Sequence, residues 1–97
     1  MFVVIFRARI KHLDPEYYSV AKHMRELALS QFGCLEFQAV CEGDDEVALS
    51  YWPSLEHIRA WKNHGEHLAA QQLGKEKWYA AWSVQIAEIV REYRVTA

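Results

Sequence analysis

Residues 34–52 read CLEFQAVCEGDDEVALSYW, and they carry the main indication of how this chain folds. Apolar and polar side chains alternate from Cys34 to Glu42, which is the pattern of a half-buried strand. Gly43 and two aspartates then supply turn residues, and residues 46–52 form a second, more apolar run. The stretch therefore predicts a β-hairpin of two antiparallel strands, with the acidic residues 44–46 read as an ordinary turn.

The chain before this hairpin predicts a strand followed by a helix. Residues 2–10 are rich in Val, Ile and Phe, which favours a strand. Asp14 is a candidate N-cap for a helix over residues 15–31, because a first-turn proline follows it and apolar residues recur at helical spacing. Gly33 is a plausible C-cap for the same helix.

The chain after the hairpin predicts a second helical region and a last strand. Ser54 is a candidate N-cap for a helix that weakens near residues 63–65. Short helical stretches are expected at 66–72 and 75–81, and residues 82–95 alternate as a strand. The resulting β-α-β-β-α-β order predicts an α+β fold in one domain spanning 1–97, in which two helices cover one face of four antiparallel strands.

The other face of the predicted sheet needs a cover of its own. The first and third strands are nearly continuous apolar runs, so both faces of the sheet carry apolar side chains. A second copy of the chain that packs sheet to sheet is the simplest cover, and the long last strand is suited to reach across. We therefore expect a homodimer through the open sheet face and the last strand.

Composition excludes several other partners. The chain of 97 residues has 11 basic and 13 acidic side chains, so it lacks the basic surface that nucleic-acid binding requires. It has no apolar run long enough to cross a membrane and no signal peptide, so a cytoplasmic location is expected. Cys34 and Cys41 lie about 23 Å apart along one predicted strand, which excludes a disulfide between them.

One block of the sequence resembles a known family. The residues that carry the resemblance are Ser50, Tyr51, Trp52, Ser54, Glu56, Ile58, Trp61, Glu66, His67, Ala70, Gln71, Gly74, Trp78 and Tyr79. In this pattern the chain resembles the antibiotic biosynthesis monooxygenase domain family, and most closely a branch of small, largely uncharacterised bacterial proteins. The resemblance covers almost the whole chain and implies a ferredoxin-like protomer that pairs into a dimeric α+β barrel.

The family includes monooxygenases that use no cofactor. In these enzymes a phenolic or quinol-type substrate loses a proton, passes an electron to O2 and becomes a quinone in a pocket between sheet and helices. Such a pocket needs an apolar lining, a group that stabilises the phenolate, and exclusion of water. The resemblance implies a small aromatic ligand, a lining of Trp61, Trp78, Tyr79 and Phe37, and His67, His64 or Arg7 as the group that polarises the phenol, with no cofactor and no metal.

Each of these residues also has a purely structural interpretation. Trp61 fits core packing, and Arg7 fits a solvated or interface position. Of the adjacent Trp78 and Tyr79, one is expected to pack in the core while the other faces a groove or the partner chain. His57, His64 and His67 would share one face of an unbroken helix, as metal ligands do, but Gly65 argues against that continuity. These alternatives leave open whether the protein is catalytic at all, and a dimeric protein that only binds a small ligand is the second hypothesis.

Haem degradation is the third hypothesis. That branch of the family has an asparagine on the first strand, a tryptophan on the second helix and a haem-binding histidine ten positions later. Trp61 matches, but Gln71 stands at the histidine position and the only asparagine of the chain is Asn63. Two of the three elements are therefore missing.

Overall fold

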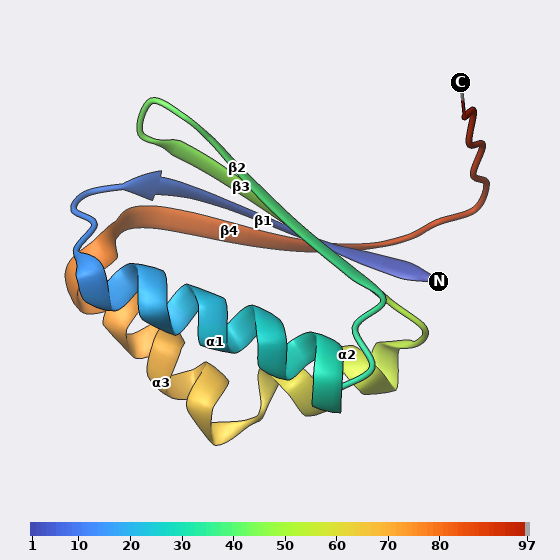
Figure 1. The fold of residues 1–97 in the computed structure, drawn as a ribbon, viewed down its shortest axis with the longest axis horizontal. Coiled ribbons are helices and arrows are strands. Elements are labelled where there is room, and N and C mark those ends of the chain that lie inside the picture. Colours follow the sequence, from blue (N-terminus) through green and yellow to red (C-terminus); the bar gives the residue numbers. More distant parts are fainter. Residues whose placement is uncertain (97) are drawn as a thin grey trace.

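The sheet has four antiparallel strands in the order β2-β3-β1-β4, and all helices lie on one of its faces (Figure 1). The computed structural model describes residues 1–96. Its elements are β1 (Phe2–Ile10), α1 (Pro15–Gln31), β2 (Glu36–Glu42), β3 (Asp45–Trp52), α2 (Leu55–Lys62), α3 (Gly65–Leu73) and β4 (Tyr79–Glu88). The predicted α+β fold with split β-α-β-β-α-β order is confirmed, with the second helix divided into α2 and α3.

The predicted helix ends are confirmed in detail. The Asp14 carboxylate accepts a hydrogen bond from the backbone N–H of Tyr17 at 2.9 Å, which caps α1. Gly33 follows α1 with φ of +80°, a left-handed conformation that favours glycine. The Ser54 hydroxyl accepts from the backbone N–H of His57 at 3.2 Å and caps α2. These contacts are local, which is why the sequence alone predicts them.

The last part of the chain differs from the prediction. The expected helix over 75–81 is a single π-helical turn at Gly74–Trp78, and β4 begins at Tyr79 rather than at Trp82. The strand also ends at Glu88, although its alternating pattern continues to residue 95. Glu88 pairs with Phe2, the first residue of β1, so β4 has no further strand of this chain to pair with beyond that point.

The core is packed at one end of the helix and sheet layers. Trp52 has no exposed surface, and it packs with buried Ala28, Cys34, Ile58 and Trp61 where the C-terminal half of α1 meets α2. The indole N–H of Trp52 donates to the Ser50 hydroxyl at 2.9 Å, so this polar atom is satisfied inside the core. Both cysteines are free thiols, as predicted.

The face of the sheet away from the helices carries an apolar band. Residues alternate along each strand, so Val3 and Ile5 of β1 lie beside Val47, Leu49 and Tyr51 of β3 on this face. All five side chains are half-buried at most, and no helix of the described chain covers them. We call this band the open face.

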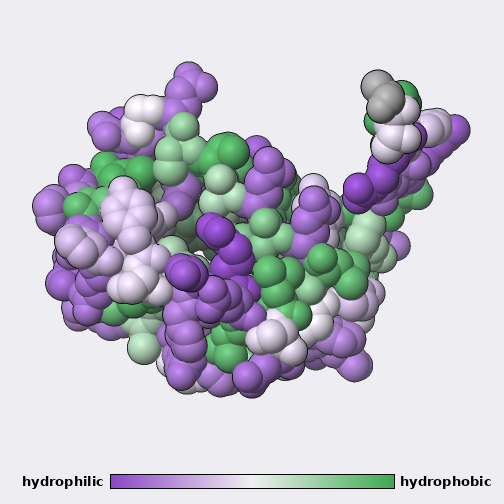
Figure 2. All heavy atoms as spheres, viewed as in Figure 1, coloured by the Kyte–Doolittle hydropathy of each residue, from purple (hydrophilic) through white to green (hydrophobic). Residues whose placement is uncertain are grey.

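The segment 89–96 leaves the sheet and projects from the body of the molecule (Figure 2). From Val90 onward its apolar side chains are highly exposed, with 92% of Val90 and 95% of Val95 accessible to solvent. Within residues 1–96, no helix combines the length and the apolar character needed to span a bilayer.

Candidate functional site

A cavity of about 460 Å³ lies between the sheet and the helices. Its floor consists of helix-facing residues of all four strands, and its roof consists of residues from α1, α2 and α3. On the β4 side the lining residues Trp82, Val84 and Ile86 are exposed, so the cavity opens there. We call this space the main cavity.

Aromatic side chains form two walls of the main cavity. On the β4 side, the Tyr79 ring lies 5.5 Å from Phe6 and 6.1 Å from Trp82, centroid to centroid, both edge to face. On the α2 and α3 side, the Trp61 ring lies 4.7 Å from the His67 imidazole. Such walls suit a flat aromatic ligand, because rings pack favourably edge to face or offset.

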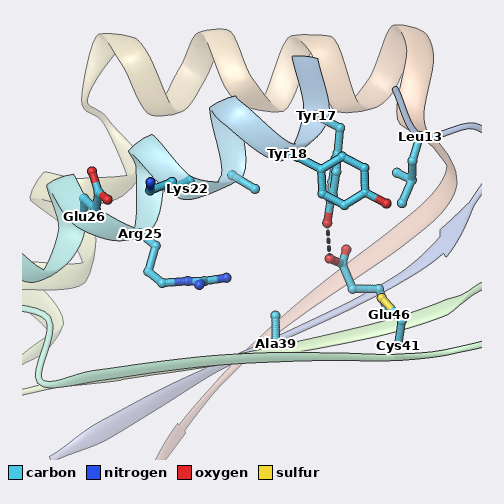
Figure 3. Close-up of a pocket in the computed structure, with 10 residues that line it drawn as sticks. Leu13, Tyr17, Tyr18, Lys22, Arg25, Glu26, Ala39, Cys41 and Glu46 are labelled. Carbon is cyan, nitrogen blue, oxygen red and sulfur yellow. Dashed lines mark hydrogen bonds between the residues drawn. The ribbon is translucent and has the colours of Figure 1, made fainter. Parts of the chain in front are cut away.

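A buried carboxylate stands in the wall of the main cavity. Glu46 is 5% exposed, and it shares the helix-facing side of β3 with Ala48 and Ser50. The Tyr17 hydroxyl, from the first turn of α1, donates to Oε1 of Glu46, and the Tyr79 hydroxyl donates to Oε2 at 2.7 Å. Figure 3 shows Tyr17 reaching down from α1 to the Glu46 carboxylate. Two phenol donors thus satisfy both carboxylate oxygens.

The same environment keeps both tyrosines protonated. Burial raises the pKa of Tyr17 and of Tyr79 far above the ordinary value, and the hydrogen bond to Glu46 raises each pKa further. A phenol that donates to a carboxylate would lose that bond on ionisation and would place two negative charges side by side. The arrangement therefore combines one acceptor with two neutral donors.

A second hollow, also about 460 Å³, opens between α1 and β2. Lys22 and Glu26 line it, and it shares Tyr17, Arg25 and Glu46 with the main cavity. In Figure 3 the Arg25 side chain extends from α1 into the space above β2. Its guanidinium lies 5.7 Å from the centre of the Phe37 ring, which is a cation–π distance.

The structure brings five of the seven predicted site residues together. His67, Trp61, Trp78, Tyr79 and Phe37 all line the main cavity. Burial lowers the pKa of His67 below its ordinary value of 6.5, and the nearby charges of His64 and Lys62 lower it further, although a hydrogen bond to the Lys62 backbone opposes this. His67 is therefore neutral at neutral pH and is able to accept a hydrogen bond.

The other two predicted residues lie elsewhere. His64 caps α3 through Nδ1, which accepts from the backbone N–H of Glu66 at 3.2 Å, and it does not line the main cavity. Arg7 is on the open face, where it donates to the Gln85 side chain at 2.9 Å. Its side chain is directed away from the helices, so the structure does not bring Arg7 together with the aromatic residues of the main cavity.

Sequence reasoning missed Glu46 and Tyr17. The three consecutive acidic residues 44–46 were read as a turn, but β3 begins at Asp45 and Glu46 already faces the helices. The available signal was its two-residue spacing from Ala48, Ser50 and Trp52, which places all four on one face of the strand. Within residues 1–96, no three His, Cys, Asp or Glu side chains are grouped as metal ligands would be.

The sheet order, the helices on one face and the cavity between them define a ferredoxin-like α+β domain. The family model for antibiotic biosynthesis monooxygenase matches residues 1–73. The chain is 35% identical over 92 residues to the uncharacterised protein YqjZ of Bacillus subtilis. The aligned region covers 94% of this chain and 81% of YqjZ. The chain belongs to the antibiotic biosynthesis monooxygenase family.

Solved structures share this fold at low sequence identity. A variant of SnoaB, a cofactor-independent oxygenase from Streptomyces nogalater, superimposes with a TM-score of 0.80 at 13% identity over 94% of each chain. Rv0793 from Mycobacterium tuberculosis superimposes with a TM-score of 0.78 at 14% identity, over 96% of this chain and 98% of that chain. At these identities the likeness establishes the fold alone.

The haem-binding pattern is absent from the corresponding places. Gln71 lines the main cavity at the position where the haem branch has a histidine, and Asn63 lies at the end of α2. The first strand, β1, contains no asparagine.

Proposed function

We propose that this protein is a cofactor-independent monooxygenase that oxidises a small hydroxylated aromatic or quinol-type compound with O2. The observation that carries the proposal is the main cavity, an aromatic-walled space with a few polar side chains on its surface. Family membership and the fold shared with a cofactor-independent oxygenase support it. A substrate of two or three fused rings suits a space of about 460 Å³.

The reaction requires few catalytic groups from the protein, because the substrate and O2 exchange the electrons directly. A phenol loses its O–H proton, the phenolate passes one electron to O2, and the two radicals combine into a ring peroxide. The peroxide then loses the ring C–H proton and expels hydroxide, which leaves as water and gives a quinone. One phenol and one O2 thus yield one quinone and one water, and no outside reductant is needed.

The lining supplies the binding and the charge stabilisation that this reaction needs. Phe6, Trp82 and Trp61 hold the ring system from both sides and exclude water. Arg25 and Lys62 are the cationic side chains of the lining, and they stabilise the phenolate. His67, which burial keeps neutral, offers a hydrogen-bond acceptor beside Trp61 and orients a second polar group of the substrate on that side.

We expect 1-naphthol or anthrone to be oxidised to its quinone by the purified protein, with one O2 consumed per quinone formed. Filling the main cavity by Ala70→Phe should lower the rate at least about tenfold, because the added ring would occupy space that the substrate needs. Ala69→Phe is the matched control, since Ala69 is the exposed neighbour of Ala70 on α3 and should change nothing. An oxygen electrode and chromatography of the product measure both quantities.

Two results would count against this proposal. Ligand binding that Ala70→Phe abolishes, without O2 uptake for any phenol or anthrone tested, would make the protein a binding module rather than an oxygenase. Equal rates in Ala70→Phe and Ala69→Phe would show that turnover does not take place in the main cavity.

We also propose that two copies of the chain pair through their open faces. Val3, Ile5, Val47 and Leu49 form an apolar band that no element of the described chain covers, and the segment 89–96 carries exposed apolar side chains beside it. Burying both on a second copy removes this surface from water. The segment 89–96 then pairs with the partner and continues the direction of β4.

Light scattering at micromolar concentration should accordingly give twice the chain mass of 11.4 kDa. Leu49→Glu should shift the mass toward that of one chain, because an unpaired charge would be buried at the centre of the interface. Glu42→Gln, at the exposed end of β2, is the control and should leave the dimer intact. A single-chain mass for the unaltered protein would refute the pairing.

A further inference from the structure

The burial of Glu46 is the feature of the main cavity that the fold itself does not require. Its neighbours on the same face of β3 are the small Ala48 and Ser50 and the core residue Trp52, and a buried carboxylate costs free energy where an apolar side chain would not. None of the ion pairs within residues 1–96 involves Glu46, so no cation lies within 4.0 Å to offset its charge. Tyr17 and Tyr79 are its hydrogen-bond partners.

The two tyrosines approach Glu46 from different sides. Tyr79 lines the main cavity, where its ring packs against Phe6 and Trp82. Tyr17 also borders the second hollow, and its ring packs edge to face against Trp78 at 5.3 Å. A ligand hydroxyl that donates to the Tyr79 oxygen is therefore separated from the Glu46 carboxylate by one hydrogen bond of 2.7 Å.

We propose that Tyr79 and Glu46 form a proton relay that removes the hydroxyl proton of the substrate and later returns it. The ligand O–H proton passes to the Tyr79 oxygen while the Tyr79 proton passes to Oε2 of Glu46. The result is a bound phenolate, a neutral Tyr79 and a neutral Glu46. When the ring peroxide collapses, the same path returns the proton to the departing hydroxide, which leaves as water, and the carboxylate is restored.

The surroundings of the relay fit this sequence of transfers. The raised pKa of Tyr79 means that this phenol gives up its proton only as it receives another, so it passes protons without becoming a tyrosinate. Tyr17 is a positioning residue, because its bond to Oε1 fixes the carboxylate with Oε2 turned toward Tyr79. The relay supplies the acceptor for the oxidation proposed above and rests on that function for its role in turnover.

A purely structural role for Glu46 makes the opposite prediction for a bound phenol. If Glu46 only fastens α1 to the sheet, its negative charge opposes a phenolate nearby, and removal of the charge should favour ionisation of the ligand. If Glu46 accepts the proton, the phenolate forms beside a neutral carboxyl group even at a pH where release of the proton to water is unfavourable, so removal of Glu46 should suppress ionisation at that pH. The direction of the change therefore separates the two roles.

The probe for this test is 4-nitrophenol, whose phenolate absorbs visible light while the neutral phenol does not. At one fixed pH below the pKa of free 4-nitrophenol, the ratio of phenolate to phenol bound to the unaltered protein is compared with the ratio in Glu46→Gln. We expect the ratio to fall at least about tenfold, equivalent to one pKa unit of the bound probe. Tyr79→Phe should lower it as much, since the relay atom is lost while the ring remains.

One control and one graded variant complete the measurement. Asp45→Asn is the control: it removes the neighbouring carboxylate, which points to the open face and pairs with Arg9 at 3.3 Å, and it should leave the ratio unchanged. Tyr17→Phe keeps the path through Tyr79 but loses the bond that fixes Oε1, so the ratio should fall by less than in Tyr79→Phe. Tyr79→Phe also guards against the case in which Glu46→Gln does not fold.

An unchanged or increased phenolate ratio in Glu46→Gln or Tyr79→Phe would overturn the relay, as would failure of the probe to bind. The assay requires no oxygen and no turnover, so it is independent of the test of the proposed function. If ionisation of the probe depends on Glu46 but the protein takes up no O2, the proton relay is supported and the proposed oxygenase activity is refuted.

Discussion

Replacing Trp52 with alanine is expected to lower the free energy of unfolding by about 3–5 kcal/mol. Trp52 is 0% exposed, and its ring lies 6.2 Å from that of Trp61 in the packed end of the molecule. Truncation would leave a large void and would remove the N–H donor from the Ser50 hydroxyl. Since a domain of this size is stable by only about 5–15 kcal/mol, much of that stability would be lost.

Chemical denaturation monitored by far-UV circular dichroism measures this effect. Trp82→Ala is the matched control, because Trp82 is 38% exposed at the mouth of the main cavity and its removal leaves no enclosed void. We expect it to cost about 2 kcal/mol, as the transfer of its partly buried apolar surface implies, and so less than Trp52→Ala. Equal losses in the two variants would mean that the packed end does not carry the stability assigned to it.

Replacing Glu46 with leucine is expected to destabilise the fold by about 2–4 kcal/mol. Leucine resembles glutamate in size, but it would leave the Tyr17 and Tyr79 hydroxyls without their acceptor in a buried site. A buried polar group that loses its partner costs about 1–3 kcal/mol. The loss also removes the contact that ties the first turn of α1 to β3, so this end of the helix should exchange its amide hydrogens faster.

A triple variant tests whether the two unpaired hydroxyls cause this loss of stability. In the triple variant Tyr17→Phe/Glu46→Leu/Tyr79→Phe, no polar atom remains unpaired, and most of the lost stability should return, as expected when both partners of a buried bond become apolar. Failure of the triple variant to recover would mean that Glu46→Leu acts through packing rather than through the two hydroxyls. Denaturant midpoints of the single and triple variants give the comparison.

The parts of the fold that sequence predicts are those set by neighbours along the chain. The caps at Asp14 and Ser54 bond to backbone three residues away, and the break between α2 and α3 falls within residues 63–65, where the sequence predicts that the helix weakens. The end of β4 is different, because its alternation continues past Glu88 but the partner strand does not. A strand is defined by its pairing, and the length of the partner is not encoded in the strand's own pattern.

The candidate site also combines residues that a local sequence pattern predicts with residues that only the tertiary fold brings together. His67 and the aromatic residues were predicted because they lie close together in one block of sequence, from Trp61 to Tyr79. The carboxylate between Tyr17 and Tyr79 joins three elements that are up to 62 residues apart, and no local pattern connects them. Arg7 lies outside the main cavity because its place in the alternation of β1 directs it to the open face, which residue type alone does not predict.

The division of this molecule into a packed end and a hollow end has a consequence for how its relatives can diverge. The side chains around Trp52 hold the layers together, whereas Ala70, Gln71 and Val84 mainly border empty space. Substitutions at these three positions change the shape offered to a ligand at little thermodynamic cost, because none of the three is fully buried. Related proteins with this fold can therefore change the ligand they bind through substitutions at a few cavity-lining positions. Selection for a stable fold acts mainly on the residues packed around Trp52.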